Sequence, residues 1–168
     1  MPIVDLRQLS ARQLEPLLEE EADHWRRELH WDYRASLELI KKFVDARSLA
    51  GCAALENGQA AGYGFYVLEE HKGLLGGLFV SPRFPQLALS QKLLGEMLAT
   101  LRAVPRIERI EAQLMPFGFT LDQALVAEGF RLYTRQFMLL SLGGGENVGP
   151  SARPPASPGD GLRLERWD

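Results

Sequence analysis

The groups best placed to do chemistry in this sequence are backbone amides, at a point where a predicted strand leads through a loop into a helix. Leu74–Val80 is a mostly apolar run, typical of a buried strand. Pro82 and Pro85 then mark a loop, and a helix is predicted from the periodic recurrence of Leu94, Met97, Leu98 and Leu101. Because the first N–H groups of a helix lack intrahelical partners and lie at the positive end of its dipole, this arrangement predicts an anion-binding site.

A few side chains could transfer a proton near the predicted strands. Glu111 and Gln113 alternate with apolar residues after that helix, Tyr133 comes later, and the loop Glu69–His71 precedes Leu74. Glu111 and Tyr133 are the candidate catalytic residues, because a carboxylate can accept a proton and a phenol can donate one. The structural interpretations are strand-edge polarity for Glu111 and Gln113, a packed ring for Tyr133 and a solvated turn for Glu69–His71.

Two helices are predicted before these residues. The first lies within Ala11–Leu29, and its start is open. Ser10 suits a cap at that end, whereas Pro16 favours a start near Glu15 that places the proline in the first turn. The second helix is predicted from one apolar stripe at spacings of three and four, formed by Tyr33, Leu37, Ile40 and Val44.

Three consecutive strands are predicted to form an antiparallel meander that ends with Leu74–Val80. Asn57-Gly58 separates the runs Ser48–Glu56 and Gln59–Glu69 and is typical of a two-residue hairpin, since both turn positions need positive φ. Gln59–Glu69 is apolar on both faces, so we expect it to be covered on both sides. Further elements are predicted at Ile3–Arg7 (strand), Ile110–Leu114 (parallel strand), Leu121–Glu128 (helix closed by Gly129) and Phe130–Leu142 (strand). The order β-α-α-β-β-β-α-β-α-β indicates an α/β fold with a mixed sheet and helices on both faces.

Composition excludes several classes of site and partner. The chain has 168 residues and a formal net charge of −3, so neither nucleic acid nor an anionic membrane is a predicted partner. The single cysteine, Cys52, excludes an internal disulfide and any paired-cysteine metal motif. His24 and His30 are six residues apart, off one helical face, so no metal site is predicted. With no signal-peptide core and no apolar run of about 20 residues, a cytoplasmic location is predicted.

Three segments are predicted along the chain: a folded domain at 1–142, a linker rich in glycine and proline at 143–161, and a strand-like segment at 162–168. The last segment alternates apolar and polar residues. We interpret it as the start of a second domain. The alternative is a tail strand that folds back on the edge of the first sheet.

The element order and the segment Leu78–Leu94 together resemble the GNAT superfamily of acyl-CoA-dependent N-acyltransferases. After their fourth strand, members read Val-x-Pro, the loop Arg/Gln-x-x-Gly-x-Gly/Ala, and a helix with a Leu-Leu pair. Val80–Pro82 and Leu93–Leu94 hold the flanking places here, and Gly129–Phe130 matches a dipeptide that opens a late strand. The resemblance covers residues 1–142 and implies that acetyl-CoA or another acyl-CoA lies between the fourth and fifth strands. The implied cofactor-binding residues are Leu78, Phe79, Val80, Gln86, Leu87, Ala88, Leu89, Ser90 and Gln91.

The chain departs from the family pattern at the loop and at the catalytic places. Pro85 takes the Arg/Gln place, while Ala88 and Ser90 take the two glycine places, where a Cβ holds a phosphate farther from the backbone. Leu125 stands where many members carry a Tyr that protonates the departing thiolate. No acid lies in Leu74–Val80 to act as a general base.

Three functions remain open on this reasoning. The first is an N-acetyltransferase acting on a small-molecule or peptide amine, favoured by Gly76–Gly77, which indicates a strand bulge or, alternatively, room for a facing Trp or Tyr. The second is a catalytically degenerate domain of the same fold in a tandem protein, with a second GNAT domain or a second copy as its partner. The third is an unrelated α/β binding module, which fourth and fifth strands paired along their whole length would support.

Overall fold

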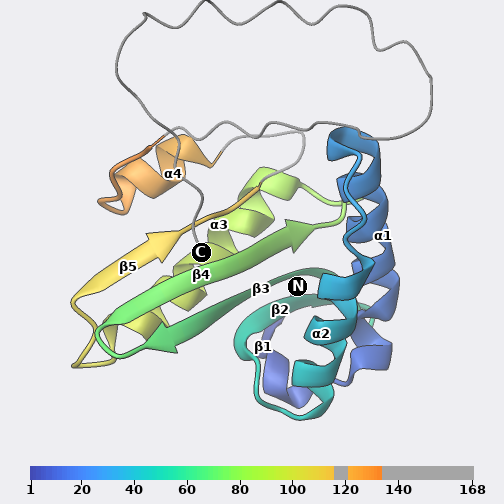
Figure 1. Ribbon diagram of the computed structural model, residues 1–168, viewed down its shortest axis with the longest axis horizontal. Helices are drawn as coiled ribbons and strands as arrows, with labels where there is room; N and C mark the ends of the chain where they lie inside the picture. Colours follow the sequence, from blue (N-terminus) through green and yellow to red (C-terminus); the bar gives the residue numbers. More distant parts are fainter. Residues whose placement is uncertain (116–120, 134–168) are drawn as a thin grey trace, which may run out of the picture. The chain divides into compact units, whose positions relative to one another are not determined.

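The computed structural model describes residues 1–115 and 121–133, and the chain divides into two units, Met1–Leu132 and Tyr133–Asp168. Within the described residues of the first unit, a mixed sheet in the order β1-β2-β3-β4-β5 carries helices on both faces, as predicted (Figure 1). The elements are β1 (Ile3–Asp5), η1 (Leu6–Gln8), α1 (Ala11–Leu29), α2 (Arg34–Asp45), β2 (Ala50–Glu56), β3 (Gln59–Glu69), β4 (Lys72–Val80), α3 (Gln86–Arg102), β5 (Arg109–Ala112) and α4 (Asp122–Ala127).

Helix α1 begins at Ala11, so the alternative start near Glu15 is wrong. The cap predicted at Ser10 is present as a capping box with Gln13, and the Ala11 N–H also donates to Oδ1 of Asp45 at 2.7 Å. Pro16 therefore lies inside the helix, where its missing N–H leaves one carbonyl without the usual helical bond. The cap and the long-range bond fix the start despite that cost.

The β2–β3 hairpin confirms the predicted turn and, over residues 60–66, the predicted burial of β3. Asn57 and Gly58 have φ values of 50° and 79°, the left-handed conformation that a two-residue turn needs. On one face of β3, Ala61 and Tyr66 pack in the core beneath α3. On the other face, Tyr63 packs in the core formed with α1 and α2. Strand β3 is thus covered on both sides as far as Tyr66, whereas Val67 and Leu68 beyond it are exposed.

Each face of the sheet has its own apolar core. Helix α2 contributes Leu37, Ile40 and Val44 of the predicted stripe, and α1 adds fully buried leucines to the same core. Tyr33, the first residue of that stripe, is the N-cap residue before α2 and packs against this core. Helix α3 fills the other core with a continuous apolar face, formed by Leu89, Leu93, Leu94, Met97, Leu98 and Leu101. The two cores hold β4 from both sides and thereby fix where its end lies.

Strands β4 and β5 are parallel, as predicted, but they pair over only part of β4. Their register runs from Lys72 opposite Arg109 to Leu75 opposite Ala112. From Gly76 onward, β4 has no pairing with β5 among the described residues, and the two strands diverge (Figure 1). The end of β4 that leads into the loop therefore presents an open edge.

A bulge in β4 stands where the two strands part. Phe65 of β3 lies opposite Gly77, whereas the next residue, Tyr66, lies opposite Leu75, so Gly76 is the extra residue. The ring of Phe65 occupies the space beside both glycines, since a Cβ built on Gly76 would overlap Cε2 of that ring. The glycine pair thus forms a bulge and also makes room for an aromatic ring, which is Phe rather than the expected Trp or Tyr.

The remaining predictions concern the C-terminal part. Helix α4 is closed by Gly129 at φ 91°, as expected, but β5 ends at Ala112 rather than at Leu114. The strand predicted over Phe130–Leu142 is not formed in its first four residues, and its remainder lies outside the described residues, as do the segments 143–161 and 162–168. None of the described helices has the length and apolar character needed to cross a membrane.

Candidate functional site

The first turn of α3 presents free backbone N–H groups. Pro85 is the N-cap residue and supplies no side-chain cap, and its carbonyl accepts the N–H of Leu89 at 3.0 Å. Within the part of the chain that the structure describes, the N–H groups of Gln86, Leu87 and Ala88 have no hydrogen-bond partner. Leu87 and Ala88 are exposed, so these donors are accessible to an anion at the positive end of the helix.

The other three residues predicted in this loop lie inside the helix. Leu89, Ser90 and Gln91 direct their N–H groups to carbonyls of the preceding turn, as helical geometry requires. Ser90 is fully buried, and its hydroxyl has no hydrogen-bond partner in the described ranges. The structure therefore narrows the accessible backbone donors to the first turn, and the role of these residues in cofactor binding stays a prediction.

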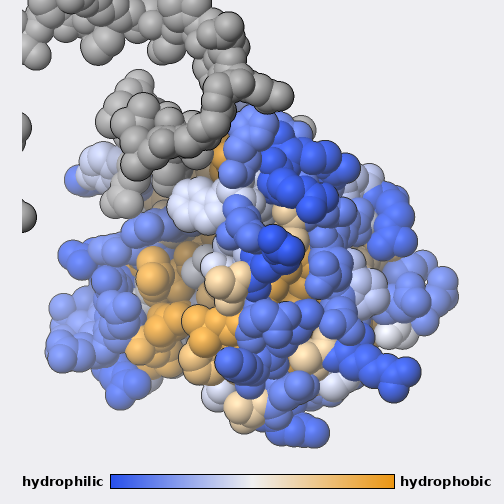
Figure 2. Space-filling view, turned by 45° about the vertical axis from the view of Figure 1, so that its right-hand side comes forward, coloured by the Kyte–Doolittle hydropathy of each residue, from blue (hydrophilic) through white to orange (hydrophobic). Residues whose placement is uncertain are grey.

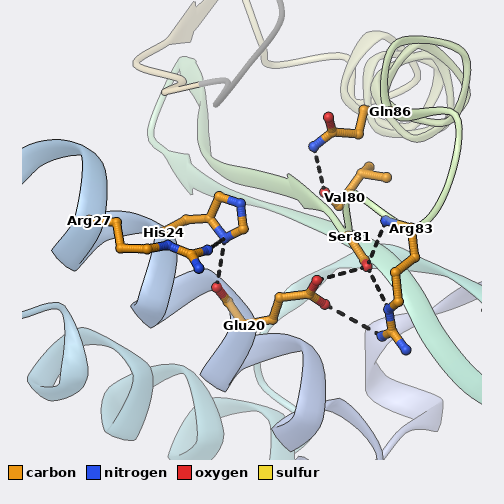
Figure 3. Close-up of polar contacts among 7 residues, drawn as sticks. All are labelled: Glu20, His24, Arg27, Val80, Ser81, Arg83 and Gln86. Carbon is orange, nitrogen blue, oxygen red and sulfur yellow. Dashed lines mark hydrogen bonds and ion pairs between the residues drawn. The ribbon is translucent and has the colours of Figure 1, made fainter.

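The open edge of β4 ends beside this turn. The Ser81 N–H donates to the Ala61 carbonyl at 3.0 Å, so Ser81 faces β3. Because alternate residues of a strand direct their backbone groups to opposite neighbours, Val80 and Leu78 direct theirs away from β3, to the side that β5 has left. The side-chain amide of Gln86 reaches back and donates to the Val80 carbonyl at 3.1 Å (Figure 3).

A polar network ties α1 to the loop between β4 and α3 (Figure 3). The fully buried Ser81 donates its hydroxyl proton to Oε1 of Glu20 at 3.0 Å and accepts from Nε of Arg83 at 3.1 Å. The guanidinium of Arg83 also lies 3.4 Å from Oε2 of Glu20. The Phe84 N–H donates to the Ser81 carbonyl, which closes a turn. Sequence analysis missed this network, because Glu20 and Ser81 are far apart in the chain.

His24 lies one turn beyond Glu20 on α1. Its ring packs edge-on against Phe79 of β4, with centroids 5.6 Å apart. Its Nδ1 lies 2.9 Å from the Glu20 carbonyl and 3.2 Å from the guanidinium of Arg27 (Figure 3). One ring nitrogen cannot donate to the carbonyl and accept from the guanidinium at once, so the tautomer decides which of the two bonds forms. The side chains of α1 thus approach the end of β4.

Glu21 is a buried carboxyl group between α1 and the sheet. It is 5% exposed, accepts the Tyr63 hydroxyl proton at 2.6 Å and accepts the Trp25 Nε1–H at 3.3 Å. Burial raises the pKa of Glu21 to about 7, and the two hydrogen bonds offset part of that rise. Burial also raises the pKa of Tyr63 well above its ordinary value, so its hydroxyl remains a donor. Sequence analysis did not single out Glu21.

Glu111 is held in ion pairs. It lies half-buried on β5, where one carboxylate oxygen is 2.9 Å from Nε of Arg109 and the other is 3.6 Å from Nζ of Lys72. Its strand position opposite Leu74 lies in the paired part of β4, away from the open edge. The structure therefore places this candidate base apart from the first turn of α3.

The candidates Glu69–His71 and Gln113 do not lie at the open edge of β4 either. Glu69–His71 line a surface hollow of about 510 Å³ together with Glu108, at the end of β4 opposite to Val80. Gln113 is exposed beyond the end of β5, and Tyr133, the first residue of the second unit, is 82% exposed. In residues 1–115 and 121–133 no group of three or more His, Cys, Asp or Glu side chains could hold a metal ion.

An apolar patch lies beside the charged surface on the side of the sheet that carries α1 and α2. Figure 2 shows apolar side chains gathered beside the hydrophilic outer surfaces of the helices. By register, Phe65, Val67 and Leu74 share the sheet face that α1 and α2 cover in part, and Val67 is 43% exposed. The uncovered part of this sheet face is thus apolar.

Comparison with solved structures assigns the fold, whereas neither a family model nor a curated protein matches the sequence. A probable acetyltransferase superposes with a TM-score of 0.59 at 14% identity, covering 88% of this chain and 100% of its own. A predicted acetyltransferase from Clostridium acetobutylicum, solved with acetyl-CoA, has a TM-score of 0.57 at 14% identity (84% and 96% covered). The aminoglycoside N-acetyltransferase AAC(6')-Iy, solved with CoA, has a TM-score of 0.53 at 19% identity (84% and 94% covered).

The chain has the GNAT fold. The interpretation as an unrelated α/β module is therefore wrong, in agreement with the parting of β4 and β5. In this GNAT fold, Leu125 is 8% exposed and packs in the core beneath α3. Leu125, which the family resemblance sets at the place of a tyrosine in many members, is thus a packed apolar side chain.

Proposed function

We propose that this chain is an acyl-CoA-dependent N-acyltransferase that uses acetyl-CoA or another acyl-CoA and acylates a small-molecule or peptide amine. One observation carries the proposal: the open edge of β4 ends beside three free N–H groups of α3. An acyl-CoA combines an extended arm with two amides, which suits an open strand edge, and a diphosphate, which suits a helix N-terminus. Solved proteins of this fold that contain CoA or acetyl-CoA support the proposal.

The residues present fit such a ligand through their backbone. The N–H groups of Gln86, Leu87 and Ala88 would hold the diphosphate, and the outward backbone groups of Leu78 and Val80 would hold the arm. No arginine or lysine of the loop reinforces the helix start, because the guanidinium of Arg83 is engaged by Glu20 and Ser81. Binding would therefore depend on backbone donors more than on side-chain charge.

The bound acyl-CoA would supply the activated acyl group, and this chain would supply position. In the transfer, the neutral amine nitrogen would attack the thioester carbonyl carbon, and a C–N bond would form as the C–S bond breaks. CoA would leave as its thiolate, and the proton lost by the nitrogen would pass through solvent to that thiolate. Among the described residues, Leu125 cannot donate to the thiolate and Glu111 is ion-paired. Catalysis would then rest on orientation of the two reactants, which by itself can lower a barrier substantially.

The same observations favour a second candidate function, a GNAT-fold domain that binds acyl-CoA without turnover. The buried Leu125 carries this alternative, because it removes the acid that the reaction commonly uses. Such a domain would serve a binding or pairing role, with a second GNAT domain or a second copy as its partner. The two functions share the ligand and differ only in turnover.

A thermal-unfolding titration with acetyl-CoA tests both functions. Ligand at 100 times its dissociation constant adds about 2.7 kcal/mol to the free energy of unfolding, so the midpoint rises by several degrees. Ala88→Glu places a carboxylate among the free N–H groups and should abolish the rise without harming the helix. Ala99→Glu makes the same substitution on the exposed face of α3, three turns later, and should keep the rise. CoA release with a panel of amines supports the transferase; a rise without release supports the binding domain; no rise at millimolar ligand rejects both.

A further inference from the structure

The hydrogen bond between Gln86 and Val80 lies within the candidate site, between the first turn of α3 and the open edge of β4. The Gln86 amide donates to a main-chain carbonyl that would otherwise stand free on the open edge of β4. Both residues are screened from solvent in part, since Val80 is 1% exposed and Gln86 is half-buried. A hydrogen bond in such surroundings competes with water less than an exposed one does.

The loop between them holds Gln86 in place. Its turn is closed by the Phe84 N–H on the Ser81 carbonyl, and Pro82 and Pro85 restrict the backbone on either side. Ser81 is in turn anchored to Glu20 of α1. Gln86, the first residue of α3, therefore lies close to the end of β4, and its side chain reaches Val80 without reorganisation of the loop.

We propose that Gln86 is an internal competitor for the ligand and sets its affinity. An extended ligand that lies along β4 places amide N–H groups where the Gln86 amide now donates, so it must displace that side chain to use the Val80 carbonyl. The inference rests on the proposed function, because the arm of an acyl-CoA is the extended, amide-bearing ligand in question. In this chain, part of the strand edge of the site is then already hydrogen-bonded before any ligand binds. The sequence pattern alone does not show this.

The competition has a direction that separates it from a supporting role. If Gln86 blocks the carbonyl, removal of its amide strengthens binding of the arm and leaves binding of the diphosphate unchanged. If Gln86 instead contacts the ligand, its removal weakens binding. Loss of one neutral hydrogen bond corresponds to about a fivefold change in affinity.

The experiment compares Gln86→Ala and Gln86→Met with wild type by calorimetric titration. Methionine keeps the length of the side chain without a donor, so it serves if the alanine variant does not fold. Three probes divide the site: acetyl-CoA for the whole, pantetheine for the arm alone, and inorganic diphosphate for the helix start. Thr100→Ala, on the exposed face of α3 away from its first turn, is the matched control and should behave as wild type.

Tighter binding of acetyl-CoA and pantetheine to the Gln86 variants by about fivefold, with diphosphate unchanged, supports the competition. Detectable binding of acetyl-CoA and pantetheine by the variants alone, with none by wild type, also supports the competition. The role of Gln86 is overturned if wild type and variants bind acetyl-CoA and pantetheine equally, or if the variants bind them more weakly. Either result leaves the proposed function intact. Failure of every protein to bind acetyl-CoA at millimolar concentration rejects the proposed function and the competition together.

Discussion

Replacing Glu21 by glutamine should remove a pH dependence from the stability of this protein. Burial raises the pKa of this carboxyl group from its ordinary value of 4.5 to about 7, so the folded chain binds a proton that the unfolded chain releases at lower pH. The stabilisation is therefore complete below pH 4.5 and is lost as the pH rises through about 7. A difference of this size corresponds to about 3 kcal/mol in the free energy of unfolding.

Urea denaturation at pH 5 and at pH 8 measures this contribution. Wild type should lose up to about 3 kcal/mol between the two values from this group, whereas Glu21→Gln, which stays neutral and keeps a carbonyl acceptor for Tyr63, should not. Glu28→Gln, an exposed change on the same helix, should retain the wild-type decline. If the Glu21→Gln curve runs parallel to that of wild type, the carboxyl group is ionised in the folded protein and the reasoning from burial is refuted.

Two further predictions concern the strand bulge and the site helix. Gly76→Ala should lower the free energy of unfolding by about 1–3 kcal/mol in denaturant titrations, because the new Cβ meets the Phe65 ring. Adding Phe65→Leu should restore part of that loss. Purely additive effects of the two changes would contradict this contact. Ser90→Ala should raise the free energy of unfolding by about 1 kcal/mol, because the change removes a buried hydroxyl without a partner in the described residues. A lower denaturation midpoint for Ser90→Ala would show that the hydroxyl is satisfied.

Local patterns in the sequence were sufficient for most of the fold. Asn57-Gly58 predicts its hairpin because only a few residue types adopt positive φ, and the stripe of Leu37, Ile40 and Val44 predicts a helix because its spacing matches one face. Pro16 suggested a wrong helix start, because its preference for the first turn is weaker than the long-range hydrogen bond between Ala11 and Asp45. The start of α1 is fixed by Asp45, which sequence reasoning had no means to place beside Ala11.

The candidate site was only partly predictable for the same reason. The turn from β4 into α3 follows from residues adjacent in sequence, so its place in the chain could be predicted. Glu21 carried a signal that went unread, since it continues the buried face of Leu14, Leu17 and Leu18 along α1. The free donors, in contrast, depend on where α3 begins.

What the sequence by itself determined is the order and type of the elements, because periodicity and turn chemistry act between neighbours. The tertiary structure alone decided the parting of β4 from β5, the anchoring of Ser81 by Glu20, and the proton held by Glu21 beside Tyr63. These features join residues that are distant in the chain. Their energies come from burial and from hydrogen-bond geometry that exist only once both faces of the sheet are covered.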